Sequence, residues 1–128
     1  MKAASEGWLN VIRLLVDKGA SLEAIDEDGG PTALMTAVLR KQRDAVQYLL
    51  RIGARIEASD QKKQTALWKA ASAGYADIVQ ILLDAGADIE TRDLEGQTPL
   101  FAAAAKGSFD TVDGILWGGV ASNIDSGV

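Results

Sequence analysis

A repeat of 33 residues constrains the fold of this chain more than any other feature. Thr32, Thr65 and Thr98 each open a similar stretch and stand 33 residues apart. A Gly-Ala pair closes the stretches, most clearly at Gly53-Ala54 and Gly86-Ala87. A fixed period of this length is the sequence signature of an array built from copies of one small supersecondary unit. We therefore predict a stack of similar units.

Each copy is predicted to contain two short helices, and the copy from residue 65 to 87 shows them best. Thr65 can cap the exposed amides of a first helix beginning at Ala66, and that helix breaks at Gly74. The second helix carries apolar residues at helical spacing between 78 and 83, and Gly86 stops it as a left-handed C-cap. The predicted fold class is all-α, a solenoid of helix–turn–helix units joined by turns or short hairpins.

Polar turns that begin with Asp precede the first helices, at residues 26–31, 60–64 and 93–97, and the first and third of them also contain Gly. The first of these turns contains one residue more than the others, at Gly30-Pro31. Insertions at an exposed loop tip are tolerated well because they disturb little packing. We expect the three turns to lie at corresponding places in the stack.

The composition narrows the chemistry available to this chain. Hydrophobic residues make up 48% but aromatic residues only 5%, so the core must be packed from Ala, Leu, Ile and Val. There is no Cys and no His, which excludes disulfides, thiol nucleophiles and imidazole acid–base chemistry. The formal net charge is −5, and the densest basic stretch, Arg40 to Arg43, is broken by Gln42. We expect a solvated helix end there and no nucleic-acid partner.

No catalytic, cofactor-binding or metal-binding residues are predicted. The acidic residues fall at turns and helix ends, where no cleft separates the pKa of one carboxylate from that of another. Gly29-Gly30 and Gly118-Gly119 lack the sequence context of a phosphate-binding loop. We expect a protein that is not an enzyme and needs no cofactor.

No leader and no apolar run long enough to span a bilayer stands out in the sequence. We expect no membrane partner. We expect an intracellular location in the cytoplasm, with the nucleus as the alternative compartment.

The copies resemble the ankyrin repeat family. In the third copy the resemblance is carried by Asp93-x-x-Gly96-x-Thr98-Pro99-Leu100-x-Ala102-Ala103, by Gly107, and by Val112-x-x-Ile115-Leu116. The resemblance divides the chain into a partial repeat at 1–25, repeats at 26–59 and 60–92, and a degenerate C-terminal repeat at 93–125, all within one continuous domain.

Three positions depart from the family pattern. Met35, Trp68 and Phe101 stand where the family usually has His. Trp68 is predicted to pack between neighbouring first helices, with a role as a binding hot spot as the alternative. Trp8 and Tyr75 occupy matching places at the starts of second helices. Trp117 is expected to cover the C-terminal end, and the last dozen residues are expected to be irregular.

The resemblance implies a protein–protein interaction module, which binds a partner through its turn tips and the concave face of its first helices. Carried onto this sequence, the partner-binding residues are Ile25, Glu27, Asp28, Pro31, Leu39, Arg40, Ser59, Gln61, Lys62, Gln64, Trp68, Ser72, Ala73, Arg92, Leu94, Glu95, Gln97, Ala105 and Lys106. The set is mixed in charge, so the sequence does not identify the partner protein. The alternative function is a passive structural spacer, a fragment of a longer ankyrin array.

The front of the chain leaves an apolar helix face without a predicted cover. The apolar residues of this half-unit have no predicted unit in front of them, although end units of a solenoid need polar outer faces. They are Val11, Ile12, Leu14, Leu15 and Val16. Three explanations are open: a cut from a longer array, self-association through this end, or a loosely ordered first unit.

Overall fold

The fold consists of short helices joined by turns, as the computed structural model shows for residues 2–19 and 32–116. The helices are α1 (Lys2–Asp17), α2 (Ala33–Leu39), α3 (Arg43–Arg51), α4 (Ala66–Ala73), α5 (Ala76–Asp84) and α6 (Pro99–Ala105), and residues 109–116 are helical as well. Over these described ranges the only β pairing is an isolated antiparallel bridge between Ser59 and Thr65. The all-α prediction is confirmed.

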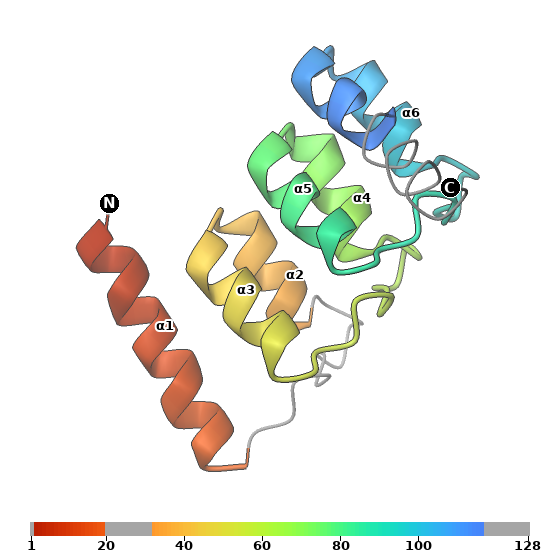
Figure 1. Ribbon diagram of the computed structural model, residues 1–128. Coiled ribbons are helices and arrows are strands. Elements are labelled where there is room, and N and C mark those ends of the chain that lie inside the picture. Colours follow the sequence, from red (N-terminus) through yellow and green to blue (C-terminus); the bar gives the residue numbers. More distant parts are fainter. Residues whose placement is uncertain (1, 20–31, 117–128) are drawn as a thin grey trace, which may run out of the picture.

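The helices form two rows that run along the stack (Figure 1). The first helices α2, α4 and α6 make one row, with α4 between the other two. The second helices make the other row, in which α3 lies between α1 and α5. The connections after α3 and α5 leave the stack on the same side (Figure 1). This is the predicted solenoid of helix–turn–helix units.

Threonine caps start the first helices, as predicted. The hydroxyl groups of Thr32, Thr65 and Thr98 each accept a hydrogen bond from the backbone N–H three residues ahead, at 3.3, 3.2 and 3.2 Å. A capping hydroxyl satisfies one of the amides that a helix N-terminus leaves without a partner, and is worth about 1 kcal/mol. The repeated threonine therefore fixes the start of each first helix.

Positive φ angles end the helices at the predicted places. Gly74 and Gly107 break the two helices of their units with φ of 77° and 71°, and Gly86 follows α5 with φ of 95°. Lys41 occupies the matching place after α2 and takes a φ of 55°. A left-handed conformation strains a residue that has a Cβ, so the turn after α2 is less favourable than its glycine counterparts.

The core combines small residues of the first row with larger apolar side chains from both rows. Ala37, Ala70 and Ala103 of the first helices are fully buried, and their small size lets neighbouring helices approach closely. Leu49 and Leu82 of the second helices are also fully buried. Leu34 and Leu67 of the first helices are buried as well. Burial of one such side chain contributes about 2 kcal/mol, so both rows supply hydrophobic stabilisation.

Helix α1 differs from its counterparts, and the prediction that Trp8 stands at the start of a second helix is wrong. Tyr75 does precede α5 as its N-cap residue, but Trp8 lies within α1, which continues through Gly7. The break at Gly74 is held because α4 packs on α2, α5 and α6, whereas α1 packs chiefly on α3. Where no neighbouring helices favour a break, continued helical hydrogen bonding is the more stable arrangement.

The uncovered apolar face predicted at the front of the chain is present on α1. Val11, Leu14 and Leu15 are each more than half exposed. The prediction is wrong for Ile12, which is buried, and for Val16, which is partly buried against the core. The corresponding leucines of later units, Leu49 and Leu82, are fully buried. Self-association through this face stays a prediction. The expectations for Trp117 and for the last dozen residues lie outside the described residues.

Two glycine substitutions should change stability in opposite directions. Gly96 has a φ of 78° and Gly114 lies in the helical segment 109–116, and an added Cβ would meet nothing within 4 Å at either position. We expect Gly96→Ala to lower the free energy of unfolding by about 1 kcal/mol because of backbone strain. Gly114→Ala should raise it by about 0.5–1 kcal/mol because alanine loses less entropy in a helix.

Urea unfolding monitored by circular dichroism measures both changes against the parent chain. Destabilisation by both substitutions would contradict the assignment of different backbone conformations to the two glycines.

Candidate functional site

An aspartate organises each turn tip that the structure describes. Oδ1 of Asp60 accepts hydrogen bonds from the backbone N–H groups two and four residues ahead, at 2.9 and 3.0 Å. Asp93 does the same in the next turn, at 2.9 Å for both. The backbone N–H of each aspartate donates to the carbonyl four residues ahead, at 3.1 and 3.0 Å. These bonds close the turns at 60–64 and 93–97 into hydrogen-bonded tips.

A buried ion pair joins the first of these tips to α4. Nζ of Lys69 lies 2.7 Å from Oδ2 of Asp60, and the two side chains are only 12% and 13% exposed. The same ammonium group donates to Oε1 of Gln64 at 3.3 Å. Burial raises the pKa of the Asp60 carboxyl, but Lys69 and the backbone N–H groups of Gln64 and Lys62 outweigh it, so the pKa lies below its ordinary value.

Two hydrogen bonds connect this tip region to the next one. The backbone N–H of Leu94 donates to the carbonyl of Lys62 at 3.0 Å. The indole Nε1–H of Trp68 donates to the carbonyl of Gln97 at 3.2 Å, and the Trp68 side chain is half-buried. Trp68 therefore connects α4 to the following turn, while its packing between neighbouring first helices stays a prediction.

Most of the predicted partner-binding residues that the structure describes are exposed. The exposed ones are Leu39, Arg40, Ser59, Gln61, Lys62, Ala73, Arg92, Leu94, Glu95, Ala105 and Lys106. Gln64, Trp68, Ser72 and Gln97 are partly buried, and three of these four take part in the hydrogen bonds above. Ile25, Glu27, Asp28 and Pro31 lie outside the described residues.

The predicted set leaves out one exposed residue at the tip, Lys63. Lys63 is exposed and takes a φ of 60°, and its own N–H donates to the carbonyl of Asp60 at 2.9 Å. The matching residue in the next turn is Gly96, with a φ of 78°. The alignment of Lys63 with this glycine was the available signal, since a residue at the apex of a turn points its side chain into solvent.

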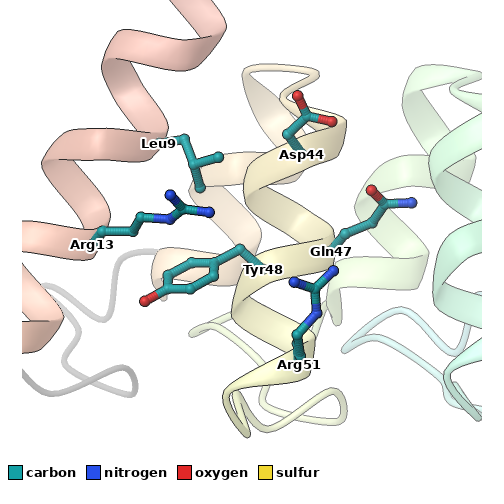
Figure 2. A pocket seen from close by; sticks show the side chains of 6 residues that line it. All are labelled: Leu9, Arg13, Asp44, Gln47, Tyr48 and Arg51. Carbon is teal, nitrogen blue, oxygen red and sulfur yellow. The ribbon is translucent and has the colours of Figure 1, made fainter.

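A shallow pocket also lies between α1 and α3, away from the turn tips (Figure 2). Arg13 of α1 extends over the ring of Tyr48 of α3, with 5.2 Å between the guanidinium carbon and the ring centroid. A cation over an aromatic face at this distance contributes about 0.5–1 kcal/mol at an exposed site. The pair helps to attach α1 to the stack.

The chain is a helical repeat protein of the solenoid class. The features that define this class here are the two rows of helices, the threonine caps and the aspartate-closed tips. A family model described as ankyrin repeats, in three copies, matches residues 1–60 and 52–125. The chain belongs to the ankyrin repeat family. A search of curated proteins gave no match. None of the helices in the described ranges is long and apolar enough to cross a membrane.

Removal of the cation from the buried ion pair should destabilise the chain and reduce its acid sensitivity. Because Lys69→Met leaves the Asp60 carboxylate without its ammonium partner, we expect a loss of about 2 kcal/mol at pH 7. The low folded-state pKa of Asp60 stabilises the parent above about pH 4, and this contribution is lost as the pH falls through that pKa. The difference in stability between pH 7 and pH 3 should therefore be smaller in the variant.

Urea unfolding at the two pH values measures this effect, with Lys106→Met as the control because Lys106 is exposed. An unchanged pH difference in Lys69→Met would show that the ion pair does not set the pKa of Asp60.

Proposed function

We propose that this chain binds another protein through its turn tips and the exposed ends of its first helices. Ankyrin repeats are generally protein–protein interaction modules. The finer assignment, to the surface around Gln61, Lys62, Leu94 and Glu95, comes from the family alignment together with the exposure of these side chains.

The observation that carries this proposal is that the two described tips are closed by hydrogen bonds and linked to each other while Gln61, Lys62, Leu94 and Glu95 are exposed. Backbone hydrogen bonds close each tip, and the bond between Leu94 and Lys62 connects the two. A surface whose backbone is already ordered loses less conformational entropy when a partner binds. Leu94 is 64% exposed, which leaves an apolar side chain on a polar tip available for contact.

The alternative is a passive spacer, in which the same surface contacts nothing and only the stacking of units matters. In either case we propose an intracellular chain without catalytic activity, with repeats at 26–59, 60–92 and 93–125 as its units. The two functions differ in whether tip side chains are required for a partner.

Four simultaneous alanine substitutions at the tips should abolish partner binding without unfolding the chain. The variant replaces Gln61, Lys62, Leu94 and Glu95, all of them exposed. Exposed substitutions change stability by only about 0.5 kcal/mol each, so the thermal midpoint should stay near that of the parent. Affinity capture from cells of the source organism, quantified by mass spectrometry, should show proteins that the parent retains and the tip variant loses.

A matched control replaces exposed residues of the same kinds on the second helices, namely Gln80, Arg51, Leu116 and Asp113. This control should retain the captured partner. Equal capture by the parent and the tip variant would favour the spacer, and equal loss from both variants would place the binding surface elsewhere.

A further inference from the structure

We propose that the tip edge, residues 59–64 and 92–97, receives an acidic segment of the partner that also carries an apolar side chain. This inference rests on the proposed function, because it specifies the chemistry of the partner at the same surface. The formal net charge of the whole chain is −5, and this charge alone would favour a basic partner segment. The structure shows that the tip edge does not share this sign.

The aspartates of the tip edge point into the turns instead of toward a partner. Asp93 is only 7% exposed, and Oδ1 of its carboxylate accepts two backbone N–H groups. The Asp60 side chain is 13% exposed and is neutralised by Lys69 at 2.7 Å. A carboxylate that is buried and paired in this way adds little negative potential outside the protein.

The remaining charges of the tip edge are mainly basic. Lys62, Lys63 and Arg92 are exposed, and Glu95 is the one exposed acidic residue in these two segments. Arg92 is held at the tip because its Nη1 donates to the carbonyl of Gly96 at 3.1 Å. A guanidinium group has five N–H donors, so this bond leaves donors for a carboxylate of the partner.

The exposed apolar side chain of Leu94 belongs to a residue that is hydrogen-bonded through its backbone to Lys62. Leu94 is 64% exposed, and its N–H donates to the carbonyl of Lys62. Exposed charges act over about 8 Å at physiological salt, so the basic side chains on the tip edge itself act most strongly on a bound segment, although exposed Glu57 and Glu90 flank the edge in sequence. In sequence the turn at 26–28 is acidic but lies outside the described residues, so the proposal covers only the second and third turns.

The test uses a short fluorescein-labelled peptide rich in glutamate with two leucines, added to the full chain. We expect saturable binding by fluorescence anisotropy, weakening as salt is added. Lys62→Glu with Lys63→Glu should weaken binding by about tenfold or more. The matched control, Lys18→Glu with Arg51→Glu, makes the same change in net charge at exposed positions away from the tips and should change binding by less than about threefold.

A second variant, Lys62→Gln with Lys63→Gly, removes both charges while glycine suits the positive φ at residue 63. It should weaken binding as well, and it serves if the double glutamate variant fails to fold. The proposal is overturned if the acidic peptide does not bind, if tip and control variants lose binding equally, or if a lysine version of the peptide binds as tightly. If the peptide result is negative but the tips are still required for capture of a cellular partner, the proposal of an acidic partner segment is wrong and the proposed function stands.

Discussion

Contact between neighbouring units is the constraint on which the rest of this structure depends. A pair of helices of seven to nine residues is too short to be stable in water alone. The fully buried alanines Ala70, Ala71 and Ala103 let α4 and α6 approach closely. The unit of α4 and α5 has neighbours on both sides, while α1 leaves Val11, Leu14 and Leu15 exposed. Packing is therefore most complete in the middle of the stack.

The turn tips also depend on contact between neighbouring units, and this dependence connects stability to the proposed function. Their backbones are fixed by Asp60 and Asp93 and joined to each other through Lys62 and Leu94. The aspartates accept the backbone N–H groups with side chains that are little exposed, so they add little negative charge at the surface. The side chains of the neighbouring lysines do not close the turns. They therefore set the sign of the charge on the tip edge.

Local chemistry made much of the fold predictable from sequence. A threonine before each first helix and a glycine after each second helix act within a few residues of themselves, so their effects could be inferred without a structure. The caps at Thr32, Thr65 and Thr98 and the breaks at Gly74 and Gly107 were predicted for this reason.

Features that depend on distant contacts were not predictable in the same way. Within the described residues α1 packs chiefly on α3, and its continuation through Gly7 follows from this packing, which no local pattern records. The bond from Trp68 to Gln97 spans two units, and the charge of the tip edge emerged only when the burial of Asp60 and Asp93 was known. Partner-binding residues beyond the tips rest on the family alignment.

Hydrogen exchange of the Trp68→Phe variant tests the central claim, that neighbouring units stabilise each other, most directly. The substitution removes the indole N–H that donates to Gln97 and should cost about 1 kcal/mol. If the units are coupled, amides of α4 and α6 should both lose protection, by about fivefold, and by similar factors. Loss of protection in α4 alone, with α6 unchanged, would contradict the account.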